Sequence, residues 1–160
     1  ITTFFELDPD GIGFVFNLNF IGTLLPTQVF AREMAKALHP VILNVSSMNS
    51  FRPLTKIPAY SAAKAAISNF TMWLAVHFSK IGIRVNAIAP GPIERTGGAD
   101  KLFQSEEAAQ RTLESVPLGR LGTPEEIADL ALYLLSDRAY YINGDCITMD
   151  GGAHLNQFPF

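Results

Sequence analysis

The stretch PVILNVSS, residues 40–47, decides the fold class. It is a short run of β-branched and aliphatic residues that ends in polar ones, which is typical of a buried strand in a parallel sheet. A second stretch of this kind, IGIRVNAIAPG at residues 81–91, is closed by Pro-Gly. Between the two, residues 59–79 predict a long, alanine-rich helix. A strand, a helix and a strand in this order predict a parallel pair joined by a helical crossover.

The same alternation continues on both sides of this unit. Residues 14–38 predict a helix with an irregularity at Pro26, and it follows turn residues at 8–11. Residues 105–115 predict a short helix capped by Ser105. The order of elements therefore remains that of an α/β protein.

The clearest helix is expected at GTPEEIADLALYLLSD, residues 122–137. Thr123 is a good N-cap, Pro124 fits the first helical position, and Glu126 completes a capping box. The chain then reaches YINGDCITMDGG, residues 141–152, which predicts a turn, a strand and a glycine stop.

These elements predict an α/β fold with a parallel sheet and helices on both faces. Three strands are few for such a sheet, and a buried apolar strand such as 41–46 should not remain at an edge. Either another chain supplies further strands or the sequence is a piece of a larger domain. We expect residues 1–160 to form a single domain that is incomplete at its N-terminal side.

Composition narrows the class of protein. The chain has 160 residues, of which 48% are hydrophobic and 17% are charged, with a net charge of −3. These values favour a compact soluble protein and argue against a nucleic-acid partner, which would select a basic surface. The only cysteine, Cys146, allows no internal disulfide and favours a reducing, cytoplasmic location. The most apolar stretch, residues 13–30, contains several polar residues, so we expect no membrane span.

Polar residues follow the predicted strands at the points where ligands bind in open α/β sheets. The first strand ends at Ser46-Ser47 and the second at Pro90-Gly91, while Tyr60 opens the intervening helix. Lys64 stands four residues after Tyr60, so both side chains lie on one helix face. A lysine beside a phenol favours the phenolate. The pair is either a proton-transfer device or a solvated helix start, and convergence of these groups on one rim favours the first.

Several motifs resemble the short-chain dehydrogenase/reductase family. A bare Tyr-x-x-x-Lys is weak evidence, but here a serine precedes the tyrosine by thirteen residues and further motifs lie in family order. They are NFIGT (19–23), ILNVSS (42–47), YSAAK (60–64), IRVNAIAPG (83–91), GRLGTPEEIA (119–128) and NGDCITMDGG (143–152). The resemblance covers nearly the whole chain and implies a Rossmann-like sheet, second half only, with the N-terminal nucleotide-binding strands missing.

The resemblance implies four catalytic residues. Tyr60 would be the general acid/base, and Ser47 would orient the substrate carbonyl and stabilise its developing charge. Lys64 would favour the phenolate, and Asn19 would hold a water that links Lys64 to solvent. From the residues alone, Asn19 could equally pin a helix irregularity by bonding the backbone.

The resemblance also implies a cofactor, NAD(H) or NADP(H), which supplies the hydride. Tyr60 and Lys64 would bind its nicotinamide ribose, and Pro90, Gly91 and Ile93 would line the nicotinamide. The glycine-rich turn that holds the pyrophosphate in this family has no counterpart in the sequence.

Two groups of relatives suggest two substrates. Residues 4–80 resemble sugar-acid reductases of the D-mannonate/fructuronate type, and residues 82–160 resemble bacterial 2,4-dienoyl-CoA reductases. We expect a small-molecule substrate, with a sugar acid as first choice and a dienoyl- or enoyl-CoA as the alternative. A hypothesis of another class is an inactive fragment that only oligomerises. In either case the helices at 14–38 and 59–79 would, by resemblance, form the interface of a homo-oligomer, a dimer or tetramer.

The remaining polar residues have simpler interpretations. Ser46 is expected to bond at the strand end and Asn86 to stabilise its strand. Arg52 and Arg95 flank the predicted cleft and could bind an anion, although solvation is favoured for each. Asp150-Gly151-Gly152 predicts a turn, and no metal site is expected. The residues expected to serve only packing or surface are His39, His77, His154 and Cys146.

Overall fold

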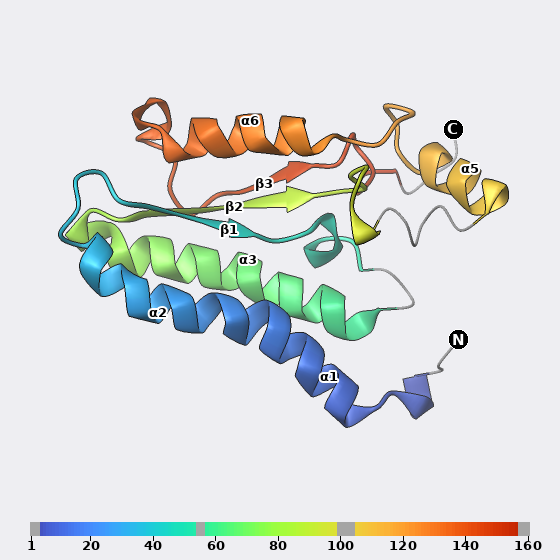
Figure 1. Cartoon of the computed structure of the whole chain (residues 1–160), viewed down its shortest axis with the longest axis horizontal. Coiled ribbons are helices and arrows are strands. Elements are labelled where there is room, and N and C mark those ends of the chain that lie inside the picture. The colour runs from blue at the N-terminus through green and yellow to red at the C-terminus, as the bar shows by residue number, and fades with distance from the viewer. Residues whose placement is uncertain (1–3, 54–56, 99–104, 157–160) are drawn as a thin grey trace.

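A three-stranded parallel sheet forms the centre of the computed structural model, which describes residues 4–53, 57–98 and 105–156 (Figure 1). The strands are β1 (Val41–Val45), β2 (Arg84–Pro90) and β3 (Cys146–Met149), in that spatial order. The register pairs Val41 with Arg84 and Ala87 with Cys146. The predicted α/β class and parallel sheet are confirmed.

One face of the sheet is covered by α3 (Pro58–Phe78). Beyond α3 lies a second layer, made of α1 (Pro9–Phe16), a π-helical turn (Asn17–Ile21) and α2 (Gly22–Met34) (Figure 1). The core on this side contains Leu74 and Ala75 of α3, Ile83 and Val85 at the start of β2, and Ala31 of α2. Small residues on α3 therefore let this helix pack closely between the sheet and the outer layer.

The other face is covered by α6 (Pro124–Leu135), which lies across the sheet from α3 (Figure 1). Ile88 of β2, Leu134 of α6 and Ala139 form its fully buried centre. Because successive side chains of a strand point to opposite faces, Val85 and Ile88 serve different cores. Short helices complete the described chain: Phe4–Glu6, Met48–Ser50, Ser79–Ile81, α5 (Glu106–Glu114) and Asp137–Ala139.

The two crossovers of the sheet have opposite hands. Both β1 to β2 and β2 to β3 step in the same direction across the sheet, but α3 and α6 lie on opposite faces. One of the two therefore departs from the strong right-handed preference of parallel crossovers.

The N-terminal helical run differs from the sequence prediction at both ends. It begins at Pro9, because the Asp8 carboxylate accepts hydrogen bonds from the backbone N–H groups of Asp10 and Gly11. It ends at Met34 instead of residue 38. The expected irregularity is not at Pro26, which lies inside regular α2, but in the π turn Asn17–Ile21. There the Gly22 N–H reaches the Asn17 carbonyl, five residues back.

By length and composition alone, the continuous helix Pro9–Met34 could cross a membrane. This differs from the prediction that residues 13–30 are too polar. A single helix of this kind is weak evidence for a span, because helices of soluble proteins pass the same test. In this structure one side of the helix packs on α3.

The end of α6 that lies near the carboxyl-end rim forms as predicted. Thr123 Oγ1 accepts from the Glu126 N–H at 3.2 Å, and Glu126 Oε2 accepts from the Thr123 N–H at 2.8 Å. This reciprocal capping box satisfies two N–H groups that a helix start otherwise leaves unpaired. It fixes where α6 begins above the end of β3.

Candidate active site

Tyr60 and Lys64 lie in the first two turns of α3, beside the end of β1. Lys64 Nζ is 5.7 Å from the centroid of the Tyr60 ring and donates a hydrogen bond to the Val45 carbonyl at 2.9 Å. The predicted stacking of an ammonium and a phenol on one helix face is therefore present. Partial burial of Lys64 lowers its pKa, because desolvation penalises the charged form.

Ser47 lies two residues after the end of β1 and is buried, with 7% of its surface exposed. Its Oγ accepts from the Asn49 N–H at 3.2 Å, which caps the short helix Met48–Ser50. Since this bond uses Oγ as an acceptor, the hydroxyl proton stays available to a ligand. Ser46, in contrast, donates to the Lys64 carbonyl at 3.1 Å and pairs with Ser68 Oγ at 2.6 Å, as expected of a strand-end residue.

Asn19 lies within the π turn, which packs against α3. Its side-chain Nδ2 donates to the Val15 carbonyl at 3.0 Å, and its own carbonyl accepts from Thr23 Oγ1 at 2.8 Å. The backbone-bonding alternative for Asn19 is thus present in the structure. The predicted water relay to Lys64 remains a prediction, with Oδ1 as the atom left to carry it.

Gly91 directly follows β2 and occupies a position that no larger residue could take without a clash. A Cβ built there would lie 2.4 Å from Asp150 Cβ, 2.7 Å from Asp150 Cα and 3.3 Å from Met48 Sδ. Its N–H donates to the Met149 carbonyl at 2.9 Å. Gly91 therefore joins the ends of β2 and β3 to the segment after Ser47, and the three strand ends meet at one rim as the sequence predicts.

Ile93 lies two residues further along and pairs with Gly122 in an isolated parallel bridge. Glu94 N–H donates to the Gly122 carbonyl at 2.9 Å, and Gly122 N–H donates to the Pro92 carbonyl at 3.0 Å. These bonds hold the segment after Gly91 against the start of α6. The sequence did not reveal this anchoring.

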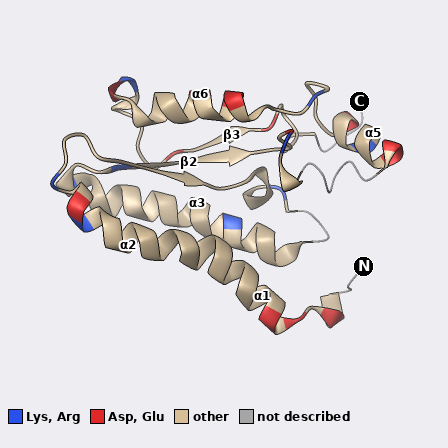
Figure 2. Cartoon of the chain, viewed as in Figure 1, with Lys and Arg blue, Asp and Glu red and all other residues tan. Residues whose placement is uncertain are grey.

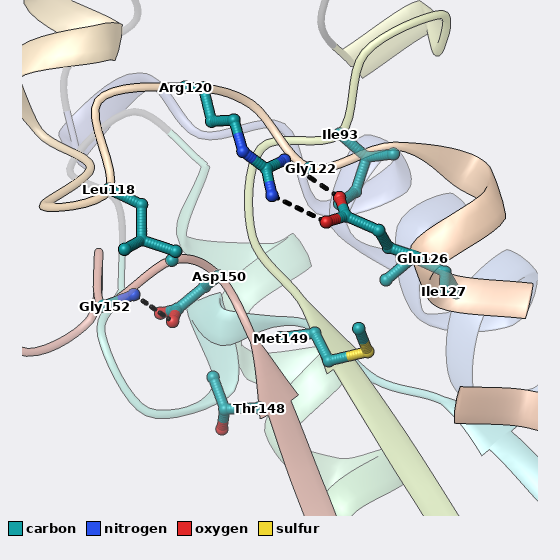
Figure 3. Close-up of a pocket in the computed structure, with 11 residues that line it drawn as sticks. Ile93, Leu118, Arg120, Gly122, Glu126, Ile127, Thr148, Met149, Asp150 and Gly152 are labelled. Atoms are coloured by element: carbon teal, nitrogen blue, oxygen red, sulfur yellow. Dashed lines mark hydrogen bonds and ion pairs between the residues drawn. The ribbon is translucent and has the colours of Figure 1, made fainter. Parts of the chain in front are cut away.

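A cavity of about 480 Å³ opens between Ile93, the end of β3 and the start of α6 (Figure 3). Figure 3 shows the residues that line it, with Arg120 and Glu126 joined by dashed bonds. It lies on the α6 side of the rim, whereas Tyr60 and Lys64 lie on the α3 side. Its lining residues are Ile93, Leu118, Arg120, Gly122, Glu126, Ile127, Thr148, Met149, Asp150, Gly151 and Gly152.

Three ion pairs lie at or near this wall. Arg120 Nη2 lies 2.7 Å from Glu126 Oε1 and its Nη1 lies 3.0 Å from Oε2, a two-point pairing. Together with the capping N–H, this pairing lowers the pKa of Glu126 to about 2. Arg95 binds Glu125 and lies 3.3 Å from Glu94, so it is an ion-paired residue rather than a free anion ligand.

Several of the remaining polar residues bond other parts of the chain. Asn86 is fully buried, donates to the Ile142 carbonyl and accepts from the Asp145 N–H. Among the described residues no group of three or more His, Cys, Asp or Glu side chains could hold a metal ion. His154 is different from the prediction of a plain surface residue, because its ring bonds the buried carboxylate of Asp150 at 2.7 Å.

Known proteins resemble this chain over most of its length. A family model described as "Enoyl-(Acyl carrier protein) reductase" matches residues 1–154. A Bacillus subtilis protein named as a probable 2,4-dienoyl-CoA reductase is 54% identical over 157 residues, covering 97% of this chain and 62% of that protein. The chain thus spans a little over half the length of the curated relatives it matches.

Solved structures show the same architecture. A Haemophilus influenzae protein described as a candidate D-mannonate oxidoreductase, with bound NAD, has a TM-score of 0.88 and 51% identity, covering 96% of this chain and 56% of that one. An Agrobacterium tumefaciens protein described as a candidate 2-deoxy-D-gluconate 3-dehydrogenase, with bound NADP, has a TM-score of 0.88 and 34% identity, covering 94% and 61%. The chain therefore belongs to the short-chain dehydrogenase/reductase family.

Proposed function

We propose that this chain carries the proton-transfer and substrate-orienting part of an NAD(P)-dependent oxidoreductase that interconverts a carbonyl and an alcohol. The observation that carries the proposal is the position of the Lys64 ammonium, 5.7 Å from the centroid of the Tyr60 ring. The same ammonium bonds the Val45 carbonyl at the end of β1, two residues before Ser47. A phenol beside a partly buried cation and a serine with a free hydroxyl proton is a suitable set for moving a proton to oxygen.

The residues present fit one end of a nicotinamide nucleotide. The Lys64 ammonium has three N–H donors, and the Val45 carbonyl accepts one of them, so two are available for ribose hydroxyls. The segment Pro90–Ile93 would lie along the nicotinamide, with its backbone fixed through Gly91 and Gly122. When bound, the nicotinamide supplies or accepts the hydride.

The chain's own residues would then complete the reaction at the substrate oxygen. Ser47 would donate a hydrogen bond to the carbonyl oxygen and stabilise its developing charge. The Tyr60 hydroxyl would pass its proton to the same oxygen during reduction and recover it during oxidation. Lys64 would favour the phenolate by its charge, and Asn19 would hold a water that connects Lys64 with solvent.

Two substrate classes remain to be separated. A sugar acid such as fructuronate or mannonate is the first choice, supported by the likeness to the Haemophilus structure at 51% identity. A 2,4-dienoyl- or enoyl-CoA is the second, supported by the Bacillus relative at 54% identity. A panel assay with D-fructuronate and a 2,4-dienoyl-CoA, followed by nicotinamide absorbance, decides between them. Activity on the acyl-CoA alone would reverse this order.

The outer surface of α1, α2 and α3 is the second feature that the proposal must explain. Figure 2 shows few charged residues along these helices. Large apolar side chains on them are exposed to water, with 77% of Val76, 62% of Phe30 and 55% of Trp73 exposed. Large exposed apolar side chains on neighbouring helices are typical of an interface, and we propose that they pair with a second copy of the chain.

Two measurements on the chain separate an enzyme from an oligomerising module. Saturable binding of NADH or NADPH supports the enzyme, whereas self-association without nucleotide binding supports the module. For the interface, Trp73→Glu should shift the sedimentation coefficient to that of a monomer. Leu132→Glu, at a comparably exposed site on α6, is the matched control and should leave the assembly intact. Unchanged assembly in Trp73→Glu would place the interface elsewhere.

A further inference from the structure

Asp150, directly after β3, is a buried carboxylate with three protein donors. Only 4% of its side chain is exposed. Oδ1 accepts from the Gly152 N–H at 2.9 Å, and Oδ2 accepts from the His154 N–H and bonds His154 Nδ1, each at 2.7 Å. A buried carboxylate satisfied in this way holds the imidazole ring of His154 in one orientation.

The orientation of His154 leaves its other ring nitrogen for a ligand. Because Nδ1 faces Asp150, Nε2 is the nitrogen that can donate outward when the ring is protonated. The His154 side chain is 28% exposed, and its ring lies 6.5 Å from the ring of Phe51. Phe51 belongs to the segment that follows Ser47, so His154 borders the predicted substrate region.

Arg52, which follows Phe51 in the chain, brings a guanidinium group close to His154. One of its guanidinium nitrogens donates to the Ala153 carbonyl, adjacent to His154. Within the described ranges no carboxylate pairs with Arg52, although Arg95, Arg111 and Arg120 each pair with a glutamate. Its charge is therefore free to meet an anion.

The two cations lie at the edge of the rim that holds the catalytic residues. The Arg52 N–H bonds the Met48 carbonyl at 2.9 Å, one turn after Ser47. On the other side, Asp150 packs directly against Gly91. The guanidinium of Arg52 supplies one positive charge that no described carboxylate neutralises, which suits one carboxylate ligand.

We propose that Arg52 and His154 bind the carboxylate of an acidic substrate, with Asp150 as the residue that positions the His154 ring. The inference rests on the proposed function, because it assigns the acidic end of the substrate whose carbonyl Ser47 and Tyr60 would engage. It makes the cluster a determinant of specificity for sugar acids over neutral sugars.

The test uses D-mannonate as probe and D-mannitol as its partner without a carboxylate. The His154 imidazole resonances of the chain are followed by NMR while each compound is added. We expect a saturable shift with D-mannonate and none with D-mannitol. Equal shifts with both compounds, or none with D-mannonate, would overturn the proposal. A shift caused by coenzyme A but not by D-mannonate would also overturn it, because the anion would then be a phosphate.

The chain contains its own matched control. His39 Nδ1 bonds Asp137 at 2.8 Å, so it is a second histidine–aspartate pair, but it lies where β1 begins, at the opposite rim. Its resonances should not move with D-mannonate. Arg52→Gln should weaken D-mannonate binding roughly tenfold or more, through loss of a charge-assisted contact. Arg138→Gln, in the short helix that also contains Asp137, should leave it unchanged; equal weakening in both variants would contradict the assignment.

Failure of this inference and failure of the proposed function give different results. Tyr60→Phe removes the proposed proton donor and should leave the D-mannonate shift intact. If turnover depends on Tyr60 while His154 ignores D-mannonate, the catalytic proposal stands and the carboxylate site falls. If His154 responds to D-mannonate but no substrate is turned over, the carboxylate site stands and the catalytic proposal falls.

Discussion

The two faces of the sheet are stabilised in different ways. On the α6 face, the helix start is closed by its own residues: Thr123 and Glu126 cap each other, and Arg120 pairs with Glu126. On the α3 face, Phe30 of α2 and both Trp73 and Val76 of α3 are exposed to water. The start of α6 is closed by the chain's own residues, whereas the aromatic side chains exposed on α2 and α3 form a surface that we propose a partner covers.

The two faces of the sheet also differ in the residues that could take part in catalysis. The α6 face is centred on aliphatic side chains such as Ile88 and Leu134, and its buried arginine, Arg84, donates to the Leu134 carbonyl at 3.0 Å. The α3 face carries Tyr60 and Lys64, together with buried polar contacts such as Asn44 to Thr71 at 2.9 Å. If the account is correct, changes on the α3 side should alter turnover, and changes on the α6 side should alter stability alone.

Tyr60→Phe should give the largest effect. Loss of a general acid/base lowers turnover by about 10²- to 10⁴-fold, with little change in the unfolding midpoint because the ring is kept. Steady-state assays with the accepted substrate measure it. Tyr133→Phe on α6 is the matched control and should retain activity. Undiminished turnover of every accepted substrate in Tyr60→Phe would reject the mechanism.

Gly91→Ala tests the junction that both faces share. The added methyl would overlap Asp150, including its Cα, so we expect a loss of about 1–3 kcal/mol in the free energy of unfolding. Urea denaturation measures it. Gly13→Ala, which meets no atom within 4 Å in helix α1, should instead gain about 0.5–1 kcal/mol. Equal stability of the two variants would mean that the close approach at Gly91 is absent.

Thr123→Ala tests the self-contained cap of α6. Removal of the N-cap hydroxyl should cost about 1 kcal/mol in the free energy of unfolding and leave substrate KM unchanged. Thr27→Ala is the control on α2, where Oγ1 only bonds the carbonyl one turn back at 2.8 Å. That change should be neutral, and a larger loss from Thr27→Ala than from Thr123→Ala would contradict the comparison.

The smallest effect concerns the Arg120–Glu126 pair. The pKa of Glu126 is lowered to about 2, so its contribution to stability is complete above its ordinary value of 4.5 and is lost as pH falls through about 2. Arg120→Gln should raise the pKa of Glu126 toward 4.5 in a carboxylate NMR titration. An unchanged titration would show that the cap N–H alone, and not the guanidinium, stabilises the carboxylate.

Local patterns explain how far the sequence predicted the fold. The β-branched runs around Val41 and Val85 predicted two strands, and Thr123-Pro124-Glu125-Glu126 predicted the start of α6, because each signal lies within a few residues. The π turn at Asn17–Ile21 was missed, since no glycine or proline lies within it and the turn packs against α3, which is distant in sequence. The periodicity of an α-helix also persists through a single widened turn.

The site was predictable to a similar extent. The rule that ligands bind beyond strand ends brought Ser47, Tyr60 and Gly91 to one rim. In contrast, the pairing of Arg95 with Glu125 joins residues 30 apart, and Arg52 reaches Ala153 across 101 positions. No pattern within one segment could reveal such contacts, and they decide which arginine has a free charge.

A double-mutant cycle on turnover tests the central claim, that Tyr60 and Lys64 act as one proton-transfer unit. Tyr60→Phe, Lys64→Met and the double variant are compared with the unaltered protein at saturating cofactor and substrate. Because residues of one unit are not independent, the double variant should be no slower than Tyr60→Phe alone. If the two losses simply multiply, the ammonium and the phenol act separately and the account is contradicted.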